Sequence, residues 1–251
     1  MKLSVCIITL NEERDLARSL ESIKKLAHEI VLIDSGSTDK TIEIAKNFEA
    51  KLYVRKFINY GAQKNYAASK AMGEWLLFLD ADEEVPPELA KEIEKSIKSS
   101  KYDGYLIPRR NILLGKEIKH SRWSPDKHVW LYKRGKGKWK GEIHEEVEVD
   151  GEVGELESAK IHYSYATVTE FLNMVNSYTE LTATTMVENE RHFSLVRLFY
   201  DPLRSFFGRY IFKLGFLDGS EGFILSMLMA YYRTLTWLKV WEKTNVKKSQ
   251  T

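Results

Sequence analysis

The sequence predicts an α/β fold, with helices flanking a mostly parallel sheet and a helical region at the C-terminal end. Up to about residue 100, short runs of Val, Ile and Leu alternate with amphipathic stretches of helical spacing. Such alternation is typical of βα units, in which helices cover a parallel sheet. Beyond residue 190, aromatic residues and leucines are instead interleaved with arginine and lysine. We therefore expect an α/β domain over residues 1–190 and an amphipathic helical region over residues 191–251.

The first part of the chain predicts four strands, each followed by a helix. The strands are indicated by apolar, largely β-branched runs, and the helices by apolar residues three or four positions apart. The expected strands cover residues 3–10, 30–33, 51–55 and 75–79. The expected helices begin at Asn11, Thr41, Ala62 and Pro86. Because ligands bind beyond the carboxyl ends of parallel strands, the polar residues that follow these strands are the first candidates for a site.

The later part of the chain has a different pattern. Three short strands are expected at residues 105–107, 129–133 and 147–149, separated by turns rich in glycine and lysine. Helical periodicity returns over residues 167–190. Two further helices are expected between Phe193 and Glu242, with a break at Asp218-Gly219.

Composition narrows the class of protein. Basic and acidic residues nearly cancel, leaving a formal net charge of +2, which argues against a dedicated nucleic-acid binder. The single cysteine, Cys6, excludes an intrachain disulfide and fits a reducing cytosol. We find neither a secretory signal nor the ~20 apolar residues of a membrane-spanning helix. The expected location is therefore the cytoplasm.

Asp80-Ala81-Asp82 directly follows the expected strand at 75–79. Carboxylates bind hard cations such as Mg²⁺ and Mn²⁺, and such a cation neutralises a diphosphate that leaves as an anion. Ala81 leaves space for the diphosphate. The motif is therefore predicted to hold a divalent cation and the diphosphate of a nucleotide sugar. The alternative is that both aspartates only cap the helix that begins near Pro86.

A second polar cluster, residues 34–39 (DSGSTD), follows the strand at 30–33. A carboxylate here can accept hydrogen bonds from a ribose hydroxyl or a base N–H, and Gly36 permits a tight turn with positive φ. We expect Asp34 or Asp39 to contact the nucleoside. The alternative is an ordinary turn in which Asp39 caps the next helix.

Four segments carry a family resemblance over roughly the first hundred residues. They are 4–12 (SVCIITLNE), 34–39 (DSGSTD), 61–65 (GAQKN) and 73–82 (GEWLLFLDAD). In this order and spacing they resemble family 2 glycosyltransferases. The resemblance implies a GT-A-type, Rossmann-like fold, an inverting reaction and usually a UDP-sugar donor.

The resemblance also implies roles for individual residues. Lys64 takes the place of a basic residue that faces the donor. Asp80 would bind the nucleotide, and Asp82 would be the direct metal ligand. The residues that would line the nucleoside pocket are Thr9, Asn11, Asp34 and Asp39.

The second half of the chain is similar to a narrower group. Segments 139–145 (WKGEIHE), 161–163 (IHY) and 213–219 (KLGFLDG) resemble bacterial β-glucosyltransferases of the lipopolysaccharide inner core. This likeness implies a lipid-linked saccharide acceptor, met at the inner face of the cell membrane.

An inverting transfer needs a general base that deprotonates the acceptor hydroxyl. The candidates are Glu142 and Glu145, and Glu145 is preferred because it follows His144 in the pair that resembles the family. The alternative is that residues 142–148 form a solvated strand edge. His162 is a candidate second metal ligand, since neutral imidazole binds Mn²⁺, although a lone histidine is more often structural. Four basic residues after the metal motif either meet phosphates or are solvated: Arg109, Arg110, Arg122 and Lys127.

The C-terminal region resembles an interfacial amphipathic helix, with basic residues on one side and aromatic residues on the other. Anionic headgroups would add about 1 kcal/mol per nearby arginine or lysine. We therefore expect a peripheral contact with a membrane surface. The alternative is two helices that pack on the sheet domain or on a second copy.

Two other functions remain alternatives to a glycosyltransferase. A nucleotidyltransferase could share the nucleotide-binding frame, but it usually carries a basic, glycine-rich loop after the first strand, where this chain has Asn11-Glu12-Glu13. A non-catalytic membrane-associated scaffold could keep the same fold, but it would not need the carboxylates that are all present here.

Overall fold

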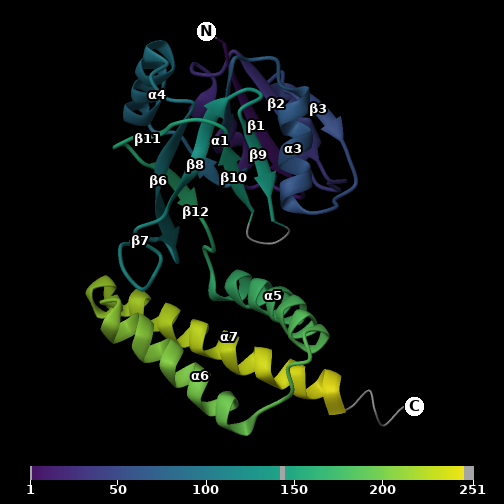
Figure 1. Cartoon of the computed structure of the whole chain (residues 1–251), viewed down its shortest axis with the longest axis vertical. Coiled ribbons are helices and arrows are strands. Elements are labelled where there is room, and N and C mark those ends of the chain that lie inside the picture. Colours follow the sequence, from purple (N-terminus) through teal and green to yellow (C-terminus); the bar gives the residue numbers. More distant parts are fainter. Residues whose placement is uncertain (1, 142–144, 246–251) are drawn as a thin grey trace. The chain divides into compact units, whose positions relative to one another are not determined.

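The protein is described from a computed structural model that covers residues 2–141 and 145–245 (Figure 1). The chain divides into two compact units. The first, which we call the sheet unit, comprises Met1–Arg110 and Asp126–His162. The second, the helical unit, comprises Asn111–Pro125 and Tyr163–Thr251.

Four parallel strands form one half of the sheet, in the order β3-β2-β1-β4. They are β1 (Leu3–Thr9), β2 (Glu29–Asp34), β3 (Lys51–Val54) and β4 (Trp75–Phe78). The helices between and after them are α1 (Leu16–Ile23), α2 (Thr41–Asn47), α3 (Tyr60–Lys70) and α4 (Pro87–Ser99). The register pairs Thr9 with Asp34, so the loops after β1 and β2 leave the sheet side by side.

The later strands extend the sheet mostly in the antiparallel direction. β8 (Lys127–Lys133) pairs with β4, and β6 (Gly104–Leu113) pairs with β8, both antiparallel. The remaining strands of the sheet unit are β5 (Glu83–Glu84), β9 (Gly137–Lys140), β10 (Glu146–Val149), β11 (Val153–Glu155) and β12 (Lys160–Tyr163). The parallel order expected from βα alternation therefore holds for β1 to β4, whereas short turns between later strands permit antiparallel pairing.

The core of the sheet unit explains why β1, β2 and β4 are almost continuously apolar. Their side chains are buried on both faces, as is usual for parallel strands covered by helices. An aromatic cluster closes the core beneath β9: Phe78 stacks on Tyr132 at 5.6 Å between ring centroids and meets Trp139 at 5.0 Å. Trp139 of this cluster also lines the cavity described below.

The helical unit contains α5 (Val168–Glu188), α6 (Leu195–Phe207) and α7 (Gly219–Asn245), which pack together as Figure 1 shows. A π-helical turn, η1 (Gly208–Phe212), and a 3-10 turn, η2 (Gly215–Asp218), connect α6 to α7. The short strand β7 (Lys116–Ile118) pairs antiparallel with residues 111–113. The helix break expected at Asp218-Gly219 is present, because α7 begins at Gly219 with a φ of 72°.

Apolar contacts hold α5 to α7. Phe171, Val175 and Leu225 form one buried cluster, and Ala183, Trp237 and Val240 form another. Helix α5, expected from the sequence to belong to the first domain, therefore packs within the helical unit. The predicted α/β architecture with a helical C-terminal region is confirmed.

The turn at η2 is fixed from within the helical unit. The buried Asp218 carboxylate accepts hydrogen bonds from the backbone N–H groups of Lys119 and His120, at 3.1 and 3.0 Å. Gly222 lies so close to this turn that a Cβ atom there would sit 1.9 Å from the carbonyl oxygen of Gly215.

We looked for bilayer-spanning segments among the helices of residues 2–141 and 145–245. None of them has the combination of length and hydropathy that crossing a membrane requires.

Candidate active site

The loops after β1 and β2 are joined by side-chain hydrogen bonds. Asn11, with a φ of 56°, donates its backbone N–H to Ser37 Oγ at 2.8 Å. Its side-chain Oδ1 accepts the backbone N–H of Thr38 at 2.9 Å. Thr9 donates its hydroxyl to Asp34 at 3.1 Å. These bonds hold three of the predicted nucleoside-binding residues at one edge of the sheet.

Asp34 and Asp39 differ in what their carboxylates contact. Asp34 is fully buried, and its Oδ1 accepts the backbone N–H groups of Gly36 and Ser37 at 2.9 and 2.8 Å. The Asp34 carboxylate therefore shapes the turn. Asp39 is half-buried and accepts the backbone N–H groups of Glu13 and Thr41, at 3.1 and 3.0 Å.

Asp80 and Asp82 follow β4, and neither caps the helix after them. Helix α4 has Pro86 as its N-cap, without a side-chain capping hydrogen bond. The backbone N–H of Asp80 instead donates to the buried carboxylate of Glu83 at 2.9 Å. Both aspartate side chains stay about 30% exposed. The capping alternative is therefore wrong, and both carboxylates are partly exposed to solvent.

Lys64 contacts both Asp80 and Glu145, and it is 81 positions from Glu145 in the sequence. Its ammonium lies 2.8 Å from Glu145 Oε1 and 3.3 Å from Asp80 Oδ1. The Lys64 side chain is only 2% exposed, and the rings of Trp130 and Trp139 flank its charge at 4.8 and 4.6 Å. Indole faces attract cations, so the two rings help to stabilise a buried ammonium.

The charges around Asp80 and Lys64 favour the ionised form of each side chain. Desolvation would raise the pKa of the Asp80 carboxyl, but the charges of Lys64, Lys160 and Arg109 outweigh it and hold that pKa well below its usual range. Burial would lower the pKa of Lys64, but Asp80 and Glu145 outweigh it and raise that pKa. Asp80 is thus an anion and Lys64 a cation at neutral pH.

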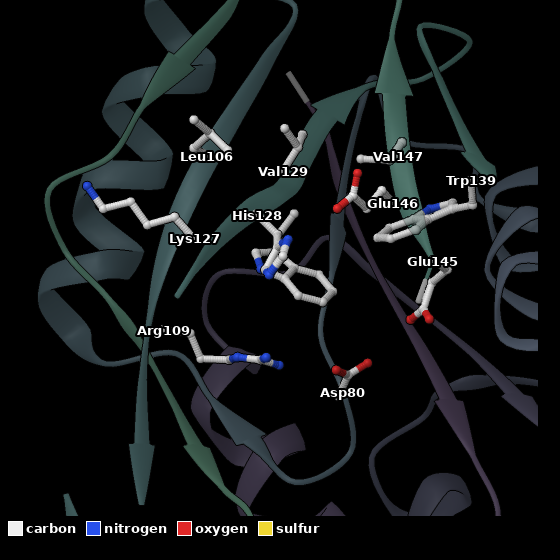
Figure 2. Close-up of a pocket in the computed structure, with 11 residues that line it drawn as sticks. Asp80, Leu106, Arg109, Lys127, His128, Val129, Trp139, Glu145, Glu146 and Val147 are labelled. Carbon is white, nitrogen blue, oxygen red and sulfur yellow. The ribbon is translucent and has the colours of Figure 1, made fainter. Parts of the chain in front are cut away.

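Asp80, Arg109 and Glu145 line a cavity of about 390 Å³, whose wall is formed by Trp130 and Trp139. Figure 2 shows the Asp80 carboxylate between the guanidinium of Arg109 and the carboxylate of Glu145. A carboxylate, a guanidinium and aromatic faces around one concave space are the groups that bind a polar, ring-shaped ligand. Glu142, the second candidate for the base, lies outside the described residues, as does His144.

His162 reaches Asp82 through a short sheet pairing. β12 runs antiparallel to β5, and the register sets His162 opposite Glu83. The His162 Nε2 atom lies 3.1 Å from Asp82 Oδ2. Burial would lower the pKa of His162, but the hydrogen bond and the charge of Asp82 outweigh it and raise that pKa.

The two predicted metal ligands therefore meet, at a separation that suits neighbouring positions around one ion. Ligands at about 2.1 Å from an octahedral ion lie about 3 Å apart. Within the described ranges no group of three or more His, Cys, Asp or Glu side chains is arranged to hold a metal. Magnesium at nucleotide sites is commonly held by one or two carboxylates together with phosphate oxygens. Asp82 offers one such carboxylate, and a neutral His162 would add a nitrogen ligand, which suits Mn²⁺ better than Mg²⁺.

A buried ion-pair network behind Asp80 was not anticipated from the sequence. Glu83 and Lys160 are both fully buried and lie 2.5 Å apart, and Lys160 also sits over the face of Trp130 at 3.2 Å. Burial lowers the pKa of Lys160 to about 8. Arg109 lies 3.4 Å from Glu83 and 2.7 Å from Asp126. Since Glu83 also accepts the N–H of Asp80, this network fixes the backbone of the motif.

Glu12 is a second residue near the site that the sequence did not predict. Burial raises the pKa of the Glu12 carboxyl to about 7, and the charges of Asp82, Asp15 and Asp80 contribute. A third acid therefore shares the negative field around Asp80 and Asp82, which a cation would relieve. The acidic Asn11-Glu12-Glu13 run was the available signal, but nothing in its spacing linked it to residues 80–82.

Comparisons with known proteins show which family the chain is similar to. The family model described as "Glycosyl transferase family 2" matches residues 4–149. An uncharacterized glycosyltransferase of Rickettsia typhi is 31% identical, over 96% of this chain and 87% of that one. The lipopolysaccharide core biosynthesis glycosyltransferase LpsC of Rhizobium meliloti is 29% identical, over 98% of this chain and 94% of its own.

Among solved structures, TarS of S. aureus (residues 1–349) aligns over 100% of this chain and 92% of its own. The TM-score is 0.49 and the sequence identity 19%. The matched family model covers more than half of this chain, including β1, β2, β4 and the Asp80-Ala81-Asp82 motif. The chain belongs to glycosyl transferase family 2.

Proposed function

We propose that this protein is an inverting, metal-dependent transferase that moves a hexose from a UDP-sugar to a lipid-linked saccharide. The observation that carries the proposal is the convergence of Asp80 and Glu145 at one cavity, where the buried Lys64 pairs with both carboxylates. This arrangement offers a group for the donor and a separate carboxylate for the acceptor within a single site. Glucose is the sugar implied by the resemblance to inner-core glucosyltransferases.

The donor end of the site would use the loops after β1, β2 and β4. The joined loops that carry Thr9, Asn11 and Asp39 would receive the nucleoside, with Asp34 shaping the turn from within. Lys64 would hold the Asp80 carboxylate in place and favour the negative charge of the diphosphate. Arg109, which lines the same cavity, would add a second positive charge.

Asp82 and His162 would hold a divalent cation, Mn²⁺ or Mg²⁺, which the donor diphosphate would share. When bound, the cation supplies charge neutralisation of the leaving diphosphate. Asp80 is less suited to direct ligation because Lys64 already pairs with it. His162 must be neutral to bind the ion, so its hydrogen bond to Asp82 has to be exchanged for the metal.

Glu145 would act as the general base that accepts the proton of the acceptor hydroxyl. Its carboxylate faces the cavity, and Lys64 fixes one of its oxygens, leaving the other for the acceptor. Glu142 remains the second candidate. A positioned base contributes about 10²- to 10⁴-fold to the rate of such a step.

The acceptor assignment draws support from the relative named for lipopolysaccharide core biosynthesis, which aligns along nearly the whole chain. We therefore propose that the reaction belongs to lipopolysaccharide core or related envelope glycan synthesis. A lipid-linked acceptor has to be met at a membrane surface, which fits a peripheral position at the inner face of the cell membrane.

The helical unit offers a surface for this contact. None of the side chains of α6 is buried, and Val196, Phe199 and Leu203 are 77, 67 and 58% exposed. The same helix carries Arg197 and Arg204 on another side. Exposed aromatic and aliphatic side chains next to arginines suit the boundary of an anionic bilayer.

The test separates the base from the donor site. Glu145→Gln should bind UDP as tightly as wild type but lose about 10²-fold or more in transfer to the acceptor. Glu146→Gln is the matched control, since Glu146 lines the same cavity. Asp82→Ala should abolish metal-dependent UDP release from a UDP-sugar while the protein stays folded. Full transfer by Glu145→Gln would move the base to Glu142, and full UDP release by Asp82→Ala would refute the metal assignment.

A nucleotidyltransferase and a non-catalytic scaffold are less well supported. A nucleotidyltransferase would release pyrophosphate from a nucleoside triphosphate, and a scaffold would tolerate loss of Asp82 and Glu145. Sugar transfer that depends on these carboxylates would exclude both alternatives.

A further inference from the structure

A second cavity lies wholly within the helical unit and has a volume of about 310 Å³. Residues from the loop before β8 and from α5 to α7 surround it. Six arginines contribute to its lining: Arg122, Arg191, Arg197, Arg204, Arg209 and Arg233. These are all the arginines of the helical unit's sequence.

The basic residues that line this cavity are all arginines. None of the lysines of the helical unit that lie within residues 2–141 and 145–245 belongs to it. The only acidic residue of the lining is Asp201, so the arginines outnumber carboxylates by five. Asp201 is already engaged by the indole N–H of Trp237 at 2.9 Å and by Arg197 at 3.7 Å. The lining therefore presents a large excess of positive charge.

Contacts with two neighbouring residues fix the side chain of Arg209. It donates to the backbone carbonyl of Ser121 at 2.6 Å, and its guanidinium lies 5.9 Å from the centre of the Trp123 ring. Burial lowers the pKa of Arg209 to about 10, and the charges of Arg122 and Arg233 contribute. Bringing these cations together disfavours the folded state, and a bound anion would offset that cost.

Arginine is the residue suited to oxygen anions, because its planar fork donates two parallel hydrogen bonds to phosphate or carboxylate. A monoanionic carboxylate would leave most of the excess charge unbalanced. A phosphate ester or diphosphate carries more charge and more acceptor oxygens. On α6, Arg197, Arg204 and Ser205 share one side of the helix, so several donors point into the same space.

We propose that the arginine-lined cavity of the helical unit is a binding site for a phosphate-bearing ligand. The phosphate belongs either to a phosphorylated lipid or to a soluble phosphorylated molecule. The inference depends on the helical unit alone and does not require the proposed sugar transfer, because no residue of the cavity around Asp80 and Glu145 takes part.

The first arm of the test measures binding of inorganic pyrophosphate by calorimetry, in EDTA so that no metal supports binding at Asp82. Arg204→Gln/Arg233→Gln, two exposed positions, should weaken binding about tenfold or more. Arg204→Lys/Arg233→Lys keeps the charge without the fork and should recover only part of the affinity. Lys213→Gln removes an exposed charge outside the cavity and should bind as wild type does.

The second arm measures co-sedimentation with vesicles of phosphatidylcholine containing phosphatidic acid, and of phosphatidylcholine alone. A lipid source predicts binding to phosphatidic acid that the paired glutamine variant loses and Lys213→Gln keeps. If the ligand is a soluble phosphorylated molecule, pyrophosphate should bind, the paired glutamine variant should lose that binding, Lys213→Gln should keep it, and no protein should bind the vesicles. Either pattern supports the site. The proposal is overturned if neither pyrophosphate nor phosphatidic acid binds, or if Lys213→Gln weakens binding as much as Arg204→Gln/Arg233→Gln does.

Discussion

Lys64→Met is the substitution that tests the candidate active site most informatively. Methionine keeps most of the side-chain volume but removes the ammonium between Asp80 and Glu145. Lys64 is 2% exposed, so water cannot replace it fully. The variant leaves two neighbouring carboxylates without their shared counter-charge, and we expect both lower stability and weaker donor binding.

The size of the effect follows from the distances. Opposite charges about 3 Å apart attract by about 5 kcal/mol at an effective dielectric constant near 20. Removing one partner of a buried ion pair costs about 3–5 kcal/mol. Because Asp80 is 30% exposed and water screens it in part, we expect a loss near the lower end of that range.

A second substitution separates charge from packing. Adding Glu145→Gln to Lys64→Met removes one of the two unbalanced carboxylates. The double variant should therefore be more stable than the sum of the single losses predicts, by about 1–2 kcal/mol. The donor site would not regain function, because its cation is still absent.

The assay is chemical unfolding monitored by tryptophan fluorescence. Trp130 and Trp139, which line the cavity, contribute to this signal. Lys138→Met, an exposed position on β9, is the control and should change stability little. Additive losses, within about 0.5 kcal/mol, would show that Lys64 and Glu145 are not coupled and would refute the reasoning.

Three further predictions concern the rest of the molecule. Burial would raise the pKa of Glu29, but hydrogen bonds, led by one from Lys51, lower it. The ionised Glu29 therefore stabilises the folded state fully above the ordinary glutamate pKa of about 4.3, and this stabilisation is lost as the pH falls through the lower folded-state pKa. The melting-temperature difference between wild type and Glu29→Gln should accordingly shrink below about pH 4. An unchanged difference down to pH 3 would contradict this. Burial raises the pKa of the Cys6 thiol, so a thiol reagent should label the protein only after unfolding, and rapid labelling of the native protein would contradict the core position of β1. Phe171→Ala should cost about 3–5 kcal/mol in chemical unfolding, whereas the exposed Leu172→Ala should cost much less; equal losses would refute the packing of α5.

Local sequence patterns predicted much of the fold. The apolar runs of β1, β2 and β4 are bounded by polar turns, so the type of these elements and their positions along the chain followed from the sequence pattern. The break at Asp218-Gly219 was visible because glycine and aspartate interrupt a helical pattern. The antiparallel entry of β8 was not visible, because strand direction depends on a pairing partner that lies far away in the sequence.

The site was predictable only in part, for the same reason. Asp80 and Asp82 stand directly after a strand, so their place at the sheet edge followed from the sequence. The contact of Lys64 with Glu145 spans 81 residues, and that of Lys160 with Glu83 spans 77. Such ion pairs depend on tertiary packing, which no local pattern encodes. The arginine-lined cavity has the same origin, since its residues are spread from Arg122 to Arg233.

The central claim is that the Asp80-Ala81-Asp82 motif binds a cation together with the nucleotide. It is tested most directly by measuring the affinity for UDP calorimetrically, with and without Mn²⁺, in wild type, Asp82→Asn and the exposed control Asp150→Asn. We predict that Mn²⁺ tightens UDP binding about tenfold or more in wild type and in Asp150→Asn, and has little effect in Asp82→Asn. Equal tightening in all three proteins would contradict the assignment of the metal to Asp82.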